Sequence, residues 1–207
     1  KYNFASEDVS TEDEFILTDD GKVLEYYTGD AKKIIIPDGV EEIVEGWYDG
    51  KDAGDVIALI IPDSVKTVPY SLCYAMGNLE VCRLSDGITE VMGFMFENCW
   101  SLQYVKLPSY ATKIGGGAFK YTVALESLYI PNTVKRIEAN AFWGSSVREV
   151  TLSKNVEFVG DYGFAFPQTS PGEVAAKMTS EQISRIQEIM NQFNTFDRVV
   201  TVLNPEL

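Results

Sequence analysis

The sequence of 207 residues predicts a repeat solenoid, a coil of short parallel β-strands joined by turns. Three observations predict this fold. A unit of about 23 residues occurs six times, each unit is anchored on a proline or a serine, and apolar residues stand at the same offsets from each anchor. A unit of this length cannot bury its own apolar face, so neighbouring units have to stack and share one continuous core.

The register of the repeat is clearest in residues 125–142, where apolar positions surround one proline. The six anchors, 22 to 25 residues apart, are Pro37, Pro62, Ser85, Pro108, Pro131 and Ser153. Five columns are apolar in every unit: three and one positions before the anchor, and three, six and eleven positions after it. The last of these columns holds Tyr48, Cys73, Phe96, Phe119, Phe142 and Phe164.

These offsets predict where each segment of a coil lies. Side chains alternate along a strand, so the two apolar residues just before the anchor point into the same core. Proline lacks the N–H donor of a β-ladder and therefore ends the strand. The apolar residues three and six positions after the anchor then line the return side, and the aromatic column stacks as a ladder. With strands about 4.8 Å apart, six coils span roughly 25 Å.

The pattern resembles the leucine-rich repeat of the BspA-like class of bacterial surface proteins, L-x-x-I-x-I-P-x-x-V-x-x-I-x-x-x-A-F-x-x-C. Residues 125–142 match it nearly throughout, Ala118-Phe119 and Ala141-Phe142 carry its A-F pair, and Cys99 falls on its cysteine. The resemblance covers about residues 31–167. It implies a right-handed leucine-rich-repeat coil and a role in surface display and adhesion, without identifying a ligand. Serine at two anchors and Trp47-Tyr48 in a longer first unit depart from the pattern.

We expect three segments within one structural domain. Residues 1–30 comprise a poorly ordered start and an N-terminal β-hairpin cap, because strand-like runs at 15–17 and 23–27 flank an Asp-Gly turn. The hairpin is expected to cover the first coil, since an open solenoid end exposes strand edges and core. Residues 31–167 hold the six repeats, and residues 168–207 form a C-terminal cap.

The C-terminal cap is expected to be an α-helix followed by a strand. Thr179 and Gln182 have the spacing of a capping box. An apolar stripe at helical spacing follows, comprising Ile183, Ile186, Ile189, Met190 and Phe193. This stripe packs on the last coil or, alternatively, binds a partner. Residues 198–203 are predicted to form the final strand.

The net charge of −14 disfavours binding to nucleic acids and to anionic membranes. Residues 1–55 carry 16 acidic and 5 basic residues, a net charge of −11, and solubility is the simplest reason for this excess. No apolar run is long enough to span a membrane. The chain starts without methionine or a signal peptide, so we expect a mature or trimmed fragment whose targeting segment has been removed.

Cysteine usage and the absence of histidine limit the chemistry of the chain. Cys73, Cys82 and Cys99 fall within the repeats, and we expect three free, mostly buried thiols rather than a disulfide. Without histidine there is no His-based triad, zinc ligand or general base. Gly115-Gly116-Gly117 lacks the Gly-Lys-Ser/Thr of a phosphate loop and is expected to be a turn. We therefore expect no cofactor, no metal and no enzyme, although paired carboxylates brought together by the fold stay open.

The outward columns of the strand, four and two positions before the anchor, carry the candidate ligand-binding site. Apolar and aromatic residues stand here beside cations, which is the composition of a binding patch. The candidate residues are Tyr104, Tyr129, Val81, Arg83, Lys106 and Ile60. Tyr104 and Tyr129 are expected to be diagonal neighbours with Cβ atoms about 5–8 Å apart. The alternative is that these residues are simply strand formers.

Three functions follow as hypotheses. The first is a secreted or cell-surface, adhesion-type module that binds a protein or glycan, possibly from host extracellular matrix, through the exposed repeat sheet. The second is a structural spacer of a longer surface protein, without a ligand of its own. The third is an enzyme with a carboxylate site, which would need two facing carboxylates in a cleft.

Overall fold

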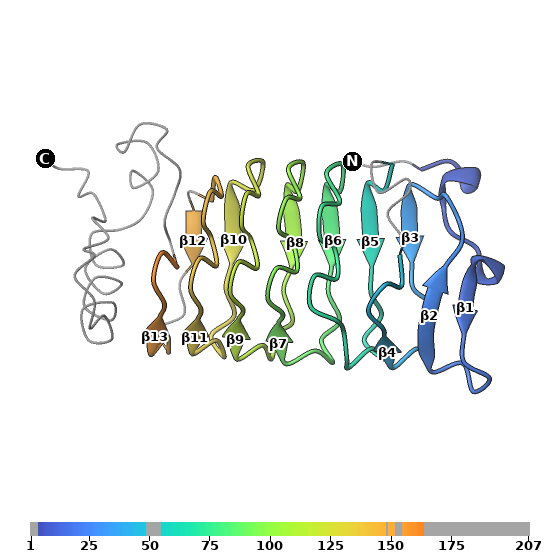
Figure 1. Cartoon of the computed structure of the whole chain (residues 1–207), viewed down its shortest axis with the longest axis horizontal. Coiled ribbons are helices and arrows are strands. Elements are labelled where there is room, and N and C mark those ends of the chain that lie inside the picture. Colours follow the sequence, from blue (N-terminus) through green and yellow to red (C-terminus); the bar gives the residue numbers. More distant parts are fainter. Residues whose placement is uncertain (1–3, 49–54, 148, 152–154, 164–207) are drawn as a thin grey trace, which may run out of the picture.

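The computed structural model describes residues 4–48, 55–147, 149–151 and 155–163, whose coils succeed one another along the long axis of a solenoid (Figure 1). Two 3-10 helices precede the strands: η1 (Ser6–Asp8) and η2 (Glu12–Glu14). The strands are β1 (Phe15–Leu17), β2 (Val23–Tyr27), β3 (Lys33–Ile35), β4 (Glu42–Ile43), β5 (Ala58–Ile60), β6 (Val81–Arg83), β7 (Glu90–Val91), β8 (Tyr104–Lys106), β9 (Lys113–Ile114), β10 (Ser127–Tyr129), β11 (Arg136–Ile137), β12 (Glu149–Thr151) and β13 (Phe158–Val159).

Each coil contributes one strand just before its anchor, and every coil but the second contributes another strand five and six positions after it; in the second coil Thr67 forms an isolated bridge with Glu42. The first kind forms a parallel sheet in the order β3-β5-β6-β8 and a separate parallel pair, β10-β12. The second kind forms a parallel sheet in the order β13-β11-β9-β7. Ile34, Leu59, Cys82 and Val105 pair in succession across the first sheet, which confirms the predicted repeat register.

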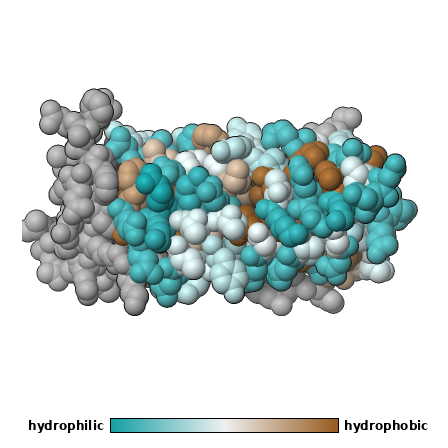
Figure 2. All heavy atoms as spheres, turned by 90° about the horizontal axis from the view of Figure 1, so that it is seen from below, coloured by the Kyte–Doolittle hydropathy of each residue, from teal (hydrophilic) through white to brown (hydrophobic). Residues whose placement is uncertain are grey.

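The core runs along the axis between these sheets and contains the apolar columns. Phe96, Phe119 and Phe142 are fully buried and stacked, with ring centroids 5.3 Å and then 5.2 Å apart. This arrangement confirms the predicted aromatic ladder over these three coils. Seen from below, the surface is mostly hydrophilic, with hydrophobic atoms in small groups (Figure 2), because the periodic apolar residues point inward.

The turn side of the coil bends through two columns of residues in the left-handed backbone region. The column nine positions after the anchor has a positive φ at Gly46, Ser71, Phe94, Gly117, Asn140 and Tyr162. The column thirteen positions after the anchor has a positive φ at Ala75, Asn98, Tyr121 and Gly144. Glycine and asparagine adopt this conformation readily, whereas a bulky residue is uncommon there.

The N-terminal end differs in part from expectation. β1 and β2 pair antiparallel, as predicted, and β2 continues in parallel with β4. Residues 4–13, expected to be poorly ordered, instead form two 3-10 helices and reach the edge of β3. The N–H of Ser10 donates to the carbonyl of Lys33 (2.9 Å), and the Oγ of Ser10 accepts from the N–H of Ile35 (2.9 Å). Pairing with a free strand edge orders this acidic segment.

The predicted C-terminal helix and strand, residues 168–207, lie outside the described residues, as does Phe164. Within the described part of the chain, no helix combines the length and the apolar character needed to cross a bilayer.

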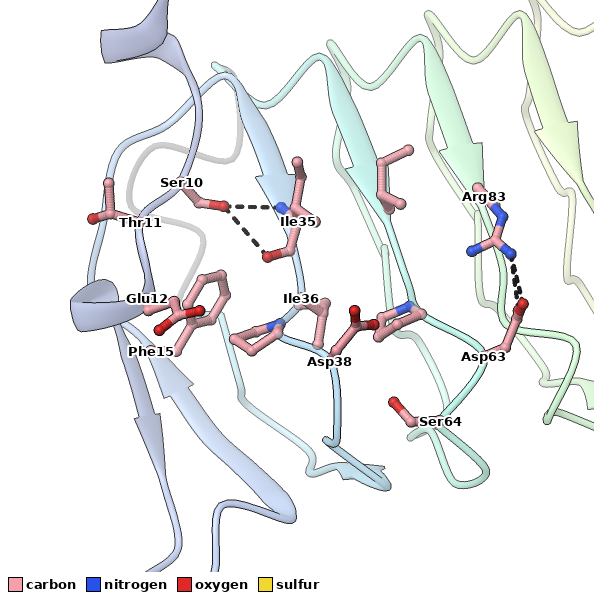
Figure 3. Close-up of a pocket in the computed structure, with 13 residues that line it drawn as sticks. Ser10, Thr11, Glu12, Phe15, Ile35, Ile36, Asp38, Asp63, Ser64 and Arg83 are labelled. Atoms are coloured by element: carbon pink, nitrogen blue, oxygen red, sulfur yellow. Dashed lines mark hydrogen bonds and ion pairs between the residues drawn. The ribbon is translucent and has the colours of Figure 1, made fainter.

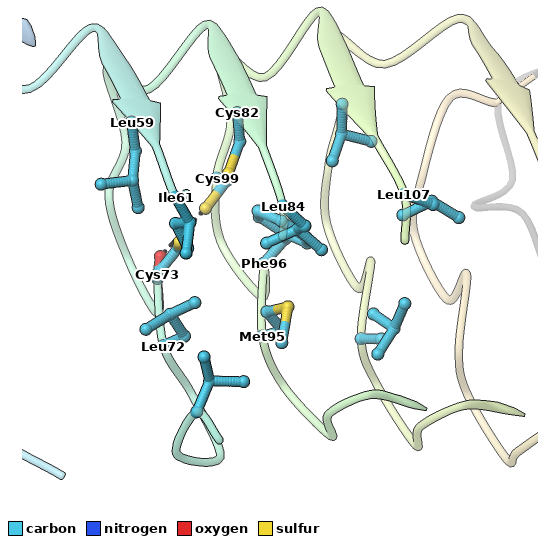
Figure 4. Packing of buried hydrophobic residues seen from close by; sticks show 14 of the residues in the cluster. Leu59, Ile61, Leu72, Cys73, Cys82, Leu84, Met95, Phe96, Cys99 and Leu107 are labelled. Carbon is cyan, nitrogen blue, oxygen red and sulfur yellow. Dashed lines mark hydrogen bonds between the residues drawn. The ribbon is translucent and has the colours of Figure 1, made fainter. Parts of the chain in front are cut away.

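The three cysteines are free and buried, which confirms the prediction made from their columns. They lie in one part of the core, among Leu59, Ile61 and Leu84 (Figure 4). The thiol of Cys99 donates to the carbonyl of Cys73 (3.0 Å). Burial raises the pKa of the Cys73 and Cys99 thiols well above the ordinary value, so both stay protonated at neutral pH.

Candidate functional site

The outward face of the first sheet exposes the two tyrosines that the sequence singled out. Tyr104 is 59% exposed and Tyr129 is 63% exposed, each at an end of its strand. Val81, Ile60, Arg83 and Lys106 are partly covered by their neighbours. The sheet face is therefore most open between β8 and β10, at the fourth and fifth anchors.

The β-ladder is interrupted at this place. Between β6 and β8, the N–H of Leu84 donates to the carbonyl of Lys106 (3.1 Å), and the N–H of Gln103 donates to the carbonyl of Glu80 (2.9 Å). One coil further, the bond equivalent to that of Leu84 would run from the N–H of Leu107 to the carbonyl of Tyr129. This bond is not formed, and among the described residues no backbone hydrogen bond links β8 with β10. Tyr104 and Tyr129 therefore stand on strands that no described backbone hydrogen bond joins, and their expected Cβ separation stays a prediction.

The same two coils remain joined elsewhere. β9 and β11 pair in parallel, and the N–H of Phe119 donates to the carbonyl of Ala141 (2.7 Å). The hydroxyl of Thr133 donates to the carbonyls of Ser109 (3.1 Å) and Ala111 (2.7 Å). The fourth and fifth coils therefore separate on the face of the first sheet and stay hydrogen-bonded on the other described sides.

The opening forms a hollow of about 450 Å³, which we call the β8–β10 hollow. It is lined by Tyr104, Val105, Lys106, Leu107, Ser109, Ser127, Tyr129, Pro131, Asn132 and Thr133. Three of the six candidate residues meet here: Tyr104, Lys106 and Tyr129. The serine and threonine hydroxyls on its lining were missed because they fall outside the apolar and aromatic pattern.

A row of ion pairs joins the coils up to this hollow and stops there. The guanidinium of Arg83 donates to both oxygens of Asp63 (2.9 and 2.8 Å), and the ammonium of Lys106 donates to Asp86 (2.7 Å). Asp86 also accepts the N–H of Ser109 (2.8 Å). The Lys106 ammonium and this N–H together lower the pKa of Asp86 to about 2.

In the next coil both members of this pair are replaced. Ser109 stands in the column of Asp63 and Asp86, directly after the anchor, and Tyr129 stands in the column of Arg83 and Lys106. The charged connection between coils is therefore absent where β8 and β10 separate. This exchange of an acid and a base for Ser and Tyr is visible in the sequence, but it does not by itself predict an opening, because β3 and β5 pair although Ile60 stands in the column of the bases.

A second hollow, of about 640 Å³, lies at the N-terminal end of the same face (Figure 3). It is lined by Ser10, Thr11, Glu12, Phe15, Ile35, Ile36, Pro37, Asp38, Ile60, Pro62, Asp63, Ser64 and Arg83. Two further candidate residues, Ile60 and Arg83, lie here, and Val81 lines neither hollow. The structure thus distributes the six candidate residues over two hollows and the strand between them.

The family follows from the repeats themselves. A model of the BspA type leucine rich repeat region matches residues 24–148 in six copies. The chain belongs to the BspA-type leucine-rich repeat family. This agrees with the resemblance drawn from the A-F pairs and the anchors, and the matched residues include both hollows except for the N-terminal segment on the second.

Structures with this fold have been solved from several bacteria. The chain resembles a T. pallidum leucine-rich repeat protein, with 25% identity and a TM-score of 0.63 over 73% of this chain and 75% of the other. A leucine-rich cell surface protein of Faecalibacterium prausnitzii is 21% identical, with a TM-score of 0.53 over 75% and 51%. A leucine-rich repeat protein of Eubacterium ventriosum is 17% identical, with a TM-score of 0.63 over 74% and 48%.

The chain thus spans three quarters of the first protein and about half of the other two. No protein of curated function matches the sequence. Among the described residues, no group of three or more Cys, Asp or Glu side chains is placed to hold a metal ion. The arrangement offers hydroxyls, backbone edges and aromatic faces, which are groups common in binding surfaces.

Proposed function

We propose that this BspA-type domain is a secreted or surface-displayed interaction module that binds a protein ligand at the β8–β10 hollow. One observation carries the proposal: the sheet opens where two exposed tyrosines flank it. Secretion and surface display are supported by the family to which the repeats belong. The β1–β2 hairpin would serve this module by shielding the first coil from solvent.

The backbone at the hollow favours a polypeptide ligand. Strand alternation directs the N–H of Val105 and Leu107 and the carbonyl of Val105 towards β10, where the described residues provide no backbone partner. Backbone donors and acceptors that lack a partner are readily complemented by another main chain, as when an extended peptide binds at a sheet edge. Such pairing gives affinity without requiring a particular ligand sequence.

The side chains at the hollow supply the remaining contact. Tyr104 and Tyr129 offer large surfaces that lose little conformational entropy on binding. Lys106 is already paired with Asp86, so its charge is largely compensated. Recognition at this hollow therefore depends on aromatic contact and hydrogen bonds more than on net charge. A glycan ligand is the alternative for the same surface, and a spacer without a ligand is the second alternative.

The test is an array of extracellular-matrix proteins and glycans probed with the purified chain. Tyr104→Ser combined with Tyr129→Ser should abolish binding to the protein hits, while the thermal midpoint changes by only a few degrees, because exposed substitutions cost little. Tyr110→Ser is the matched control, since Tyr110 is 67% exposed and lies outside the hollow. Full binding by the double variant would refute this site, and an array with glycan hits alone would favour the alternative ligand.

A further inference from the structure

The turn side of the solenoid carries a second group of exposed aromatic residues, remote in the repeat from the sheet face. We call it the turn-side aromatic row. It consists of Tyr70, Tyr74, Phe94, Tyr121 and Trp143, all of them exposed. These residues come from four successive coils and stand eight to thirteen positions after their anchors. The row therefore extends along the solenoid axis.

Three rings of the row lie against a glycine of the next coil. A Cβ added to Gly117 would lie 2.7 Å from Cδ1 of Phe94, and one added to Gly93 would lie 3.3 Å from Cδ1 of Tyr70. The Tyr121 ring lies against Gly144 in the same way and more closely. One side of each ring thus covers the backbone of the following coil. Because these side chains are at least 39% exposed, the opposite side is open to solvent.

Two of these aromatic residues occupy strained backbone positions. Phe94 has a φ of 56° and Tyr121 a φ of 60°. Of the four neighbouring positions in these columns, three hold glycine or asparagine, which accept this conformation more readily, and the fourth holds serine: Gly117, Asn98, Gly144 and Ser71. Strained bulky residues often mark functional positions. Contact with a glycine explains where the two rings lie, but it does not explain why a bulky residue occupies a strained position.

The middle of the row has an ion pair and amide groups beside it. Lys120 pairs with Glu97 (2.7 Å), and its ammonium lies 5.2 Å from the centre of the Tyr121 ring. The hydrogen bond to the Glu97 carboxylate raises the pKa of Lys120, so Lys120 stays charged at neutral pH. Asn98 and Asn140 add amide groups in the two left-handed columns. The row therefore combines flat apolar faces with hydrogen-bonding groups.

This combination fits a sugar chain. A pyranose ring has an apolar C–H face that packs on an aromatic ring, and hydroxyls around its rim that bond to amides and charged groups. The coils repeat about every 4.8 Å, a step comparable to the length of one sugar ring. The net charge of −14 disfavours acidic polysaccharides. We propose that the turn-side aromatic row binds a neutral β-linked polysaccharide laid along the solenoid axis, independently of the β8–β10 hollow.

The experiment is calorimetric titration with cellohexaose as the probe. Phe94→Asn and Tyr121→Asn remove the rings and introduce a residue that Asn140 and Asn98 show to be compatible with these two columns. Each should weaken binding about three- to tenfold, the effect of losing one aromatic contact. Tyr110→Asn, an exposed tyrosine outside the row, should bind as the unmodified protein does. The Tyr104→Ser, Tyr129→Ser variant should also bind cellohexaose normally, which separates this proposal from the preceding one.

The unmodified chain should bind cellohexaose and not polygalacturonate, an acidic chain of similar sugar rings. The proposal is overturned if the folded protein does not bind cellohexaose, if the Phe94→Asn, Tyr121→Asn double variant binds it at full affinity, or if polygalacturonate binds equally well. It is also overturned if sedimentation shows a dimer that the double variant abolishes, because the row would then be a contact between two copies of the chain.

Discussion

Truncation of Phe119 to alanine tests the core of the repeat most directly. Its ring is fully buried and stacks on Phe96 at 5.3 Å and 20°, and on Phe142 at 5.2 Å and 4°. Removing a buried phenylalanine costs about 3–5 kcal/mol, through lost transfer free energy and the remaining cavity. Because Phe119 has a ring on each side, we expect the free energy of unfolding to fall by about 4–5 kcal/mol, in the upper part of this range.

Equilibrium unfolding in urea, followed by far-UV circular dichroism, measures this loss. Phe96→Ala is the matched variant, since among the described residues Phe96 stacks on Phe119 alone. Its loss of unfolding free energy should be smaller than that of Phe119→Ala by the contribution of one aromatic pair, about 0.5–1.5 kcal/mol. The slope of the transition should be compared among the variants, because repeat arrays can unfold in parts. Losses below about 1 kcal/mol for both variants would refute the stacked ladder and the register on which it depends.

Three further outcomes follow from the structure. Asp86→Asn removes the carboxylate that accepts from Lys106 and should lower the free energy of unfolding by less than about 1 kcal/mol. Because the pKa of Asp86 in the folded protein is lowered to about 2, the stabilisation by this carboxylate is present above about pH 4 and is lost as the pH falls towards 2. Urea titrations of the unmodified protein and of Asp86→Asn should therefore converge in acid. All three thiols should react with a thiol reagent only after unfolding without reductant, and a count of one per chain would contradict their being free. Gly144→Ala should destabilise more than Gly21→Ala: both have a positive φ, but only Gly144 lies against the Tyr121 ring, and equal thermal midpoints would exclude that contact.

The strands and the core could be predicted because every coil repeats the same inward columns. Ser85 shows how far this extends: it replaces proline at an anchor, yet it stays fully buried because its hydroxyl donates to the carbonyl of Val65 and accepts the N–H of Gly87. The anchor column tolerates serine when both bonds are made. A repeat pattern therefore predicts the average coil, including coils that depart from it at one position.

The β8–β10 hollow could not be predicted from the inward columns, because these are as apolar in the fifth coil as in the others. Its lining includes outward residues, Ser109 and Tyr129, in columns where the two preceding interfaces between coils have an acid and a base. The course of residues 4–13 was missed for a different reason. Ser10 contacts Ile35, 25 residues away, and no local pattern in a polar segment predicts pairing over that separation.

An opening on one side of a solenoid is compatible with a stable coil because each coil contacts only its neighbours, and the interfaces contribute nearly independently. The fourth and fifth coils lose the ladder between β8 and β10, but they keep the β9–β11 pair and the bonds of Thr133. Beneath the opening, Phe119 and Phe142 form the most parallel of the stacked Phe pairs in the described core. The cost of exposing two strand edges therefore stays within one interface. The stacked rings of Phe119 and Phe142 keep the two coils in contact below the opening, and this rigid support favours the binding site that we propose there.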